Sequence, residues 1–292
     1  MKKQVKYPFK NLVFEGGGVL GVAYQGFYEV LEKYGITKNI SKVCGTSAGS
    51  ISSSMIALGY TADECKQVLL DLPFNTFSDG GWLGPYRLLT KYGWYKGDKM
   101  KDFFCEIIKN KTGDPNISFK EAHAEGFLEL RLIATNATQN KSVVFSHTNT
   151  PNLSIAEGMR ASSSIPYFFA AQKINSDIFV DGGLLRNYAI EEFDENDASI
   201  TTLGAYLLDP KKPPVPIKGF FSFSAHFMAS VKKQQYVQLV HNKKNFDRTV
   251  FIDDLGISSI DMKITKDQKL ALMEQGKIAT EKFLQQWSVT QH

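Results

Sequence analysis

Short apolar runs alternate with stretches of helical periodicity in the first part of the chain. Residues 11–14 form a mostly apolar run that ends at three glycines, which predicts a buried strand and a tight turn. A helix ending near Gly35 is expected next, because five apolar positions recur at helical spacing, namely Val22, Ala23, Phe27, Val30 and Leu31. A strand at residues 40–44 and a helix at 50–58 repeat this order. Such a succession is typical of a parallel α/β layer fold.

The rest of the pattern predicts one domain over residues 1–292, because no internal repeat or low-complexity linker divides the chain. Further strands are expected at residues 130–135, 143–145, 178–180, 201–208 and 250–252. Helices are expected at residues 154–162, 217–240 and 266–287, so the part 217–292 is mainly helical and follows a proline-rich loop at 210–216. Residues 74–104 are rich in aromatic side chains and glycine. They predict a lid-like insertion over the sheet, ending where Asp98 caps a helix.

Composition and charge limit the class of protein. The chain has 292 residues and is 43% hydrophobic, which is enough for a sizeable core. Its 34 basic and 30 acidic residues leave a net charge of only +4, whereas nucleic-acid binding would need a concentrated basic stripe. Lysine pairs at residues 211–212, 232–233 and 243–244 are expected to be solvated. Contact with an anionic membrane surface is the alternative for these lysines.

The sequence also bears on location. The cysteines Cys44, Cys65 and Cys105 have no metal-ligand spacing and imply no disulfide framework, which favours a reducing compartment. No apolar stretch of signal-peptide length follows the basic residues 1–6, and no run approaches the roughly 18 apolar residues that span a bilayer. We therefore expect a cytoplasmic protein. Transient membrane association and export without a cleaved signal stay open.

A candidate nucleophile lies between the second predicted strand and its helix. Residues 45–49, Gly-Thr-Ser-Ala-Gly, match the pattern G-x-S-x-G. A nucleophilic serine must project from a sharp strand-to-helix turn, where side chains two residues away would collide, so Gly45 and Gly49 flank Ser47. The helix that follows brings a positive dipole end near a developing oxyanion. A glycine-serine turn without chemical function has the same short pattern.

The glycine cluster at residues 16–21 has two interpretations. As G-x-G-x-x-G it matches a dinucleotide fingerprint, but that site needs an acidic residue about 20 positions further on, and residues 40–45 hold no carboxylate. As an oxyanion hole the cluster makes better sense, because Gly16, Gly17 and Gly18 lack side chains and expose backbone N–H groups to a tetrahedral intermediate. One such donor typically contributes about 3 kcal/mol to acyl transfer.

A third motif, Asp181-Gly182-Gly183, follows the predicted strand at residues 178–180. An aspartate there would lie at the carboxyl edge of the sheet, where open α/β sheets place their sites. A plain Asp-Gly turn is the alternative. The three motifs are stronger together than alone, because each follows a predicted strand and each has a distinct role.

In this order the motifs resemble those of the patatin-like phospholipase family, which combines a GGGxxG loop, a GxSxG nucleophile and a DGG aspartate. The matching positions are residues 16–18 with Gly21, 45–49 and 181–183, and residues 160–169 resemble the family's small-residue-then-proline segment. The resemblance covers about residues 9–190. It implies a three-layer α/β/α fold with a mostly parallel central sheet. It also implies a lipid acyl hydrolase of phospholipase A or lysophospholipase type.

The resemblance further implies a catalytic dyad of Ser47 and Asp181 without a histidine. Asp181 would accept the proton of Ser47, which attacks the ester carbonyl while the loop 16–18 holds the oxyanion, and water would then hydrolyse the acyl-enzyme. No cofactor or metal site is expected, and activity should not depend on calcium. The expected partner is a phospholipid or another acyl-ester lipid, and the oligomeric state stays open.

The chain departs from the family pattern at two places. The family usually has Arg or Lys inside the glycine loop, where this chain has Leu20. Its DGG segment often continues to Asn-x-Pro, whereas here Asn187 is followed by Tyr188 and Ala189. Leu20 is the one feature that supports a different interpretation, a catalytically silent lipid-binding scaffold with the same fold.

An α/β-hydrolase with a Ser-Asp-His triad is the remaining alternative. In chain order such a triad would use His226 or His241, because His123 and His147 precede Asp181 and would break that order. Both candidates lie on or near the predicted helix 217–240, where a surface histidine or one with its hydrogen bonds satisfied is more common.

Overall fold

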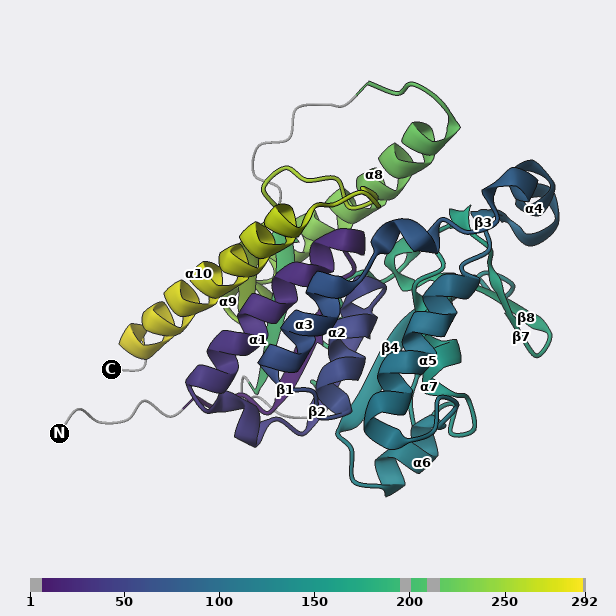
Figure 1. Ribbon diagram of the computed structural model, residues 1–292. Helices are drawn as coiled ribbons and strands as arrows, with labels where there is room; N and C mark the ends of the chain where they lie inside the picture. The colour runs from purple at the N-terminus through teal and green to yellow at the C-terminus, as the bar shows by residue number, and fades with distance from the viewer. Residues whose placement is uncertain (1–6, 195–200, 209–215, 291–292) are drawn as a thin grey trace.

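A central sheet organises the computed structural model, which describes residues 7–194, 201–208 and 216–290 (Figure 1). Within these residues the sheet has eight strands, with β5 paired to β4 beside the order β10-β9-β1-β2-β4-β8-β7. The strands are β1 (Asn11–Phe14), β2 (Lys42–Thr46), β4 (Glu129–Asn136), β5 (Lys141–Phe145), β7 (Gln172–Ile174), β8 (Asp177–Asp181), β9 (Thr202–Leu208) and β10 (Thr249–Asp253). From β10 to β4 neighbouring strands run parallel, and the pairs of β4 with β5, β4 with β8 and β7 with β8 are antiparallel.

Helices cover both faces of this sheet (Figure 1). One face carries α1 (Ala23–Lys33), α2 (Ala48–Ala57), α3 (Ala62–Asp71), α5 (Asp98–Thr112), α7 (Ile155–Ser162) and α10 (Lys266–Thr290). The other carries α8 (Phe220–His241) and α9 (Lys243–Asp247). Shorter elements are α4 (Gly84–Lys91), α6 (Phe119–Ala124), β3 (Gly93–Tyr95), β6 (Tyr167–Phe169) and the 3₁₀ helices η1 (Gly18–Val22), η2 (Ile36–Asn39), η3 (Phe74–Phe77), η4 (Gly81–Leu83) and η5 (Gly182–Leu184).

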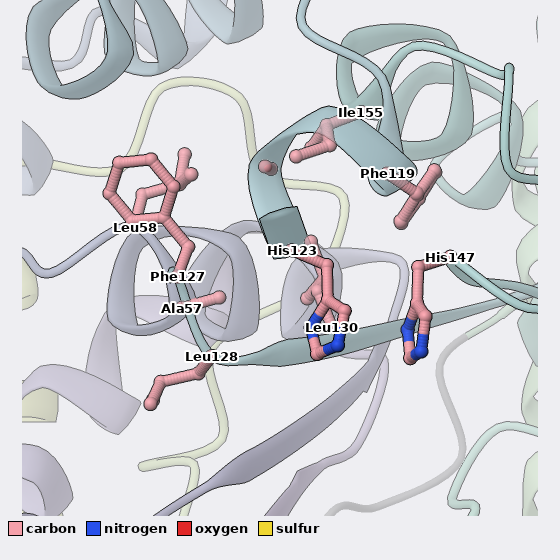
Figure 2. Close-up of a pocket in the computed structure, with 10 residues that line it drawn as sticks. Ala57, Leu58, Phe119, His123, Phe127, Leu128, Leu130, His147 and Ile155 are labelled. Carbon is pink, nitrogen blue, oxygen red and sulfur yellow. The ribbon is translucent and has the colours of Figure 1, made fainter. Parts of the chain in front are cut away.

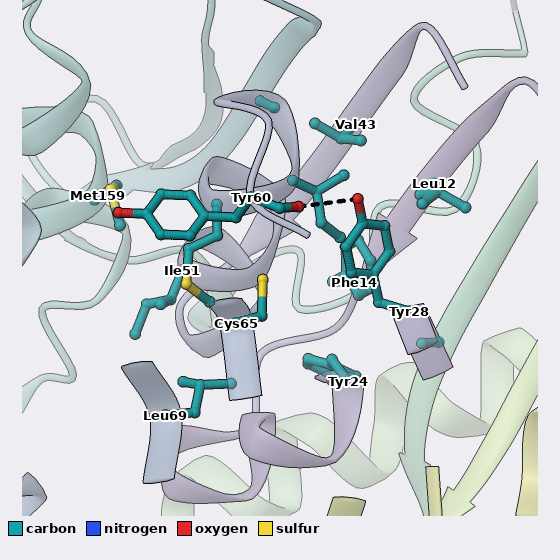
Figure 3. Packing of buried hydrophobic residues seen from close by; sticks show 14 of the residues in the cluster. Leu12, Phe14, Tyr24, Tyr28, Val43, Ile51, Tyr60, Cys65, Leu69 and Met159 are labelled. Carbon is teal, nitrogen blue, oxygen red and sulfur yellow. Dashed lines mark hydrogen bonds between the residues drawn. The ribbon is translucent and has the colours of Figure 1, made fainter. Parts of the chain in front are cut away.

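Alternate residues of the central strands enter two separate hydrophobic cores. In β1, Leu12 and Phe14 belong to the larger core beneath α1, α2 and α10, whereas Val13 belongs to the smaller core beneath α8. This alternation follows from the period of two in a strand and explains why the strands are apolar on both sides. Figure 3 shows part of the larger core, where the Tyr28 hydroxyl donates a hydrogen bond to the Tyr60 carbonyl at 3.1 Å. The predicted three-layer α/β/α fold is confirmed.

The helix after the predicted insertion is capped by a different residue from the one expected. Asp98 is the first residue of α5, and its exposed side chain does not cap the helix. The carboxylate of Asp79 instead accepts hydrogen bonds from the amides of Gly97, Asp98 and Lys99 at 2.6, 3.0 and 3.2 Å. The prediction of Asp98 as the cap is therefore wrong. Asp79 precedes the amides that it caps by 18 to 20 residues, so a search for a capping residue next to the helix does not find it.

The aromatic region 74–104 contains η3, η4, α4, β3 and the start of α5. Its strand β3 pairs in parallel with β6 to make a small second sheet, and α4 lies beyond β3, away from the main sheet (Figure 1). Of the predicted loop at 210–216, all but Pro216 lies outside the described residues. No helix in the described ranges has both the length and the hydropathy needed to cross a bilayer.

Candidate active site

Strands β2 and β8 meet end to end along one edge of β4. β2 pairs in parallel with β4 until Thr46 lies opposite Ile133, and β8 pairs with it antiparallel until Asp181 lies opposite Ala134. β5 pairs with residues 132–136 of β4, which include residues paired with β2 and residues paired with β8. β5 must therefore occupy the other edge of β4, and β2 and β8 share one edge. Ser47 follows Thr46 directly. The residue after β2 and the last residue of β8 therefore reach the same level of the sheet from opposite directions.

The backbone of Ser47 is strained. Its φ of 52° and ψ of −120° lie outside the regions that residues with a side chain favour, and α2 begins at the next residue. A Cβ atom on Gly45 would lie 2.0 Å from the Gly49 carbonyl oxygen, and one on Gly49 would lie 2.4 Å from that of Phe14. The turn thus requires glycine at both positions, because any side chain there would collide with the backbone. The sequence motif predicted glycine for the same reason.

Asp181 is a buried carboxyl group with a raised pKa. Its side chain is 2% exposed, and burial raises the pKa from 3.8 to about 6, although the Ser47 hydroxyl and the Gly183 amide lower it in part. Oδ1 accepts the Gly183 amide at 2.8 Å. Oδ2 is buried and has no partner of ordinary hydrogen-bond geometry among the described residues, so it can still receive a proton or a hydroxyl group. The Ser47 hydroxyl, which influences this pKa, is the candidate donor.

The glycine loop after β1 lies against this pair. A Cβ atom on Gly16 would come within 3.1 Å of the Ser47 Cβ, so the loop backbone touches the serine. The Gly16 amide donates to the Asn187 carbonyl at 3.1 Å and is therefore already occupied. Among the described residues, the amides of Gly17 and Gly18 have no acceptor. Of the three glycines predicted to hold an oxyanion, two keep an available N–H group.

A buried ion pair supports the start of this loop. The Glu15 carboxylate is fully buried and accepts hydrogen bonds from the Leu207 amide at 2.8 Å and the Asn187 side chain at 2.9 Å. The Lys232 ammonium group of α8 lies 3.1 Å from the same carboxylate. Burial raises the pKa of Glu15, and Lys232 partly reverses the shift. The prediction that Lys232 is solvated is wrong, because this side chain is two-thirds covered and paired with Glu15.

Helix α8 also holds the segment after Asp181. The Gln235 side chain accepts the Asn187 amide at 2.7 Å and donates to the Gly183 carbonyl at 3.2 Å. The Asn187 side chain in turn donates to the Gly16 carbonyl at 3.0 Å. One helix therefore positions both loops that flank Ser47. The sequence contained no signal for this role, because Lys232 and Glu15 are 217 residues apart.

The small-residue segment at the end of α7 fixes the turn at Ser47. The Ser162 hydroxyl accepts the Ser47 amide at 2.9 Å and donates to the Ile133 carbonyl at 2.6 Å. The Ser164 carbonyl accepts the Asp181 amide at 2.9 Å. This segment is thus bonded to the backbone of both residues of the pair. The resemblance singled out the segment, but the structure supplies its role.

A buried arginine joins the same segment to the region 74–104. Arg160 donates to the carbonyls of Lys96, Gly97 and Ala170 and to the Ser164 hydroxyl, at 2.7 to 3.1 Å. Burial lowers the pKa of its guanidinium group to about 10, so the group stays charged at neutral pH. These bonds satisfy a charge that would otherwise be costly to bury. They hold β3 and the start of α5 beside the site.

The described histidines do not contact Ser47 or Asp181. His226 and His241 each donate Nδ1–H to the carbonyl four residues earlier in α8, at 2.7 and 2.6 Å. His123 and His147 stack with ring centroids 3.9 Å apart and line a small cavity at the opposite end of β4 (Figure 2). His292 lies outside the described residues.

Leu20 is buried in the larger core. The residue at the position where the family usually has Arg or Lys therefore contributes packing in this chain. In the described ranges no group of His, Cys, Asp and Glu side chains has the arrangement of a metal site.

Several known proteins resemble this chain in sequence or in fold. A family model described as patatin-like phospholipase matches residues 12–194. The chain is 30% identical over 301 residues to the uncharacterised protein YqhO of Bacillus subtilis, and the match covers 94% of this chain and 98% of that protein. It is 30% identical over 185 residues to the probable lipid hydrolase 463L of Invertebrate iridescent virus 6, covering 63% and 62% of the two chains. The structure of VipD from Legionella pneumophila has the same fold, with a TM-score of 0.67 at 17% identity over 96% of this chain and 67% of VipD.

The buried carboxylate predicts that Asp181→Asn stabilises the fold at high pH. The folded pKa of about 6 exceeds the ordinary value of 3.8, so ionisation of Asp181 costs stability above pH 6 and costs nothing below pH 3.8. We expect the substitution to raise the free energy of unfolding by about 2–3 kcal/mol at pH 8. The gain should shrink toward zero as the pH approaches 4. Urea titrations at both pH values measure it.

Asp177→Asn is the matched control for this experiment, because it changes a carboxylate of the same strand that accepts a hydrogen bond from Asn136 at 2.7 Å. It should not stabilise the protein. If Asp181→Asn unfolds more easily than the wild type at pH 8, the burial penalty assigned to Asp181 is wrong.

The ion pair beside the glycine loop predicts a coupled effect on stability. Lys232→Met leaves the buried Glu15 carboxylate without its counter-charge and should cost about 2 kcal/mol at pH 8. The raised pKa of Glu15 means that the cost falls at lower pH, where Glu15 becomes protonated. The double variant with Glu15→Gln should recover part of the loss in urea titrations. Lys233→Met, which changes the exposed neighbour, should have little effect, and an equal loss in both lysine variants would count against the pair.

Proposed function

The chain belongs to the patatin-like phospholipase family, and we propose that it is a lipid acyl hydrolase of phospholipase A or lysophospholipase type, with Ser47 as nucleophile and Asp181 as base. The meeting of β2 and β8 supports this most directly, because it brings a strained serine and a buried carboxyl group to one level of the sheet. The name of the related viral protein, probable lipid hydrolase 463L, supports a lipid as the substrate.

In the proposed acylation step, Asp181 accepts the proton of the Ser47 hydroxyl while the serine oxygen bonds to the ester carbonyl carbon. The carbonyl oxygen becomes an oxyanion, for which the available amides of Gly17 and Gly18 are candidate donors. The Ala48 amide at the start of α2 is a third. Each such donor is worth about 3 kcal/mol to this kind of reaction. Collapse of the intermediate breaks the ester bond, and the departing alcohol takes the proton from Asp181.

In the proposed deacylation step, Asp181 removes a proton from water, whose oxygen attacks the acyl-enzyme. The free fatty acid leaves, and the Ser47 oxygen regains a proton from Asp181. An ordinary carboxylate is a weak base for both steps. The desolvation that raises the pKa of Asp181 to about 6 increases its proton affinity. The unpartnered Oδ2 is the atom with capacity for the proton.

The two alternatives from the sequence have less support. A triad needs a histidine that bonds to both Ser47 and Asp181, but Nδ1–H of His226 and of His241 is bonded within α8. A silent scaffold rested on Leu20, which is a packing residue in this structure. Neither alternative makes use of the higher proton affinity that burial gives to Asp181.

Substitution of the proposed pair should separate these functions. Product analysis on a panel of phospholipids and acylglycerols should show fatty-acid release by the wild type. Ser47→Ala and Asp181→Asn should each lower turnover by at least about a thousandfold. A fluorophosphonate probe should label the wild type and leave Ser47→Ala unlabelled. His226→Ala and His241→Ala are controls that should keep near-normal rates. A large loss in either histidine variant would favour the triad, and a wild type without label or product would favour the scaffold.

The pH dependence of the reaction should follow the ionisation of Asp181. A protonated carboxyl group cannot act as a base, so kcat/KM should fall tenfold per pH unit below about 6 and level off above it. A water-soluble short-chain nitrophenyl ester avoids effects of the lipid interface in this measurement. A rate that increases from pH 7 to pH 4 would contradict Asp181 as the base.

A further inference from the structure

Residues 81–92, which include η4 and α4, expose a row of large apolar side chains. Trp82 is 84% exposed, Tyr86 67% and Leu89 81%, and Tyr92 is also largely uncovered. The first three are spaced four and three residues apart, which places them on one side of a helical segment. Such exposure of tryptophan and leucine is unusual for a surface that faces only water.

The first half of α8 exposes a second row. Phe220, Phe223 and Phe227 are between 45% and 57% exposed, and Ile217 just before the helix is 58% exposed. The spacing of three and four residues puts the three phenylalanines on one face of the helix. The later part of the same helix holds the loops beside Ser47, through contacts of Lys232 and Gln235.

The small sheet β3–β6 connects the two rows. α4 packs beside β3, β3 pairs with β6, and the Phe220 ring lies edge-on to Tyr167 of β6 with ring centroids 5.8 Å apart. In Figure 1, α4 and the first half of α8 lie at the upper right of the molecule. β6 begins three residues after Ser164, whose carbonyl binds the Asp181 amide. The rows are therefore connected, through β6, to the segment that is bonded to Asp181.

The charges in both segments have one sign. Residues 80–97 contain three basic and no acidic residues, and residues 216–241 contain three lysines and no acidic residue. Two of these cations are used inside the protein, because Arg87 is buried and Lys232 is paired with Glu15. Lys91, Lys96 and Lys218 are exposed. Of the two acidic residues that flank this segment, Asp79 is occupied by the amides at the start of α5. The other, Asp98, lies 3.9 Å from the Lys96 ammonium group. Aromatic side chains favour the interface of a bilayer, and exposed lysines such as Lys91 and Lys218 favour an anionic one.

We propose that these two rows, with their lysines, form a docking surface for an anionic lipid bilayer, which brings the Ser47 site to lipids that remain in the membrane. The proposal rests on the proposed lipid hydrolase function. The most exposed side chains lie on helical segments, and their combination of aromatic and basic residues suits a lipid surface better than a second protein. Docking through α8 would also act on the helix that positions the glycine loop.

Vesicle binding without turnover tests the surface. The experiment uses the full chain with Ser47→Ala and vesicles of phosphatidylcholine, either alone or mixed with phosphatidylserine, in a flotation assay. The protein should float with the mixed vesicles and much less with phosphatidylcholine alone. Combined Trp82→Ser and Leu89→Ser should weaken binding at least about tenfold, and so should combined Phe223→Ser and Phe227→Ser. Lys91→Glu with Lys218→Glu should remove the preference for phosphatidylserine.

Ile278→Ser with Leu270→Ser is the matched control, because both side chains are exposed apolar residues of α10. It should bind as the parent protein does, and circular dichroism should show that every variant is folded. The proposal is overturned if the parent protein fails to bind mixed vesicles, if the control loses as much binding as the two serine pairs, or if neutral vesicles bind equally well. It is also overturned if sedimentation shows a dimer that the serine pairs dissociate, with no vesicle binding.

Hydrolysis of a soluble short-chain ester by the same variants with Ser47 intact separates the two proposals. The serine pairs should keep the wild-type rate on this substrate and lose at least about tenfold on vesicles. Ester hydrolysis without vesicle binding would overturn the docking surface alone. Vesicle binding without any hydrolysis would overturn the proposed function and leave the docking surface in place.

Discussion

The arrangement of the site depends on one strand, β4, which pairs with two others along the same edge. β2 and β8 run in opposite directions, and their carboxyl ends point toward each other along that edge. This brings Ser47 and Asp181 to the same level of the sheet. Strained backbone at a residue such as Ser47 costs about 1–3 kcal/mol, and burying the Asp181 carboxylate adds to that cost. Ladder hydrogen bonds on both sides of β4, together with the Ser162 and Ser164 contacts, hold the two residues in place.

A second layer of support comes from the face of the sheet beneath α8. Lys232 neutralises the buried Glu15, and Gln235 bridges Gly183 and Asn187. The glycine loop has few side chains with which to fix its own shape, so these contacts determine the direction of its amides. The same helix exposes Phe223 and Phe227 near its start. The fold thereby links the surface of the molecule to the loop that faces Ser47.

Local patterns in the sequence predicted much of this fold. Apolar runs located the central strands, helical spacing located α1, α8 and α10, and Gly35 has the left-handed backbone expected after a helix, with φ of 70°. Local steric rules also explain Gly45 and Gly49. They did not reveal the cap of α5, because Asp79 is remote in sequence from the amides that it accepts. Nor did they show that the Gly16 amide is already bonded to Asn187.

The sequence alone determined the types of chemical group at the site, a serine at a tight turn, an aspartate after a strand and a loop without side chains, since these are set by residue type and spacing. Only the tertiary structure decided that β8 runs against β4, that Asp181 is desolvated and that Lys232 is paired with Glu15. Each of these depends on contacts between segments far apart in the chain. The pKa of a carboxyl group and the direction of a strand follow from the neighbours that folding supplies, and periodicity along the chain does not encode them.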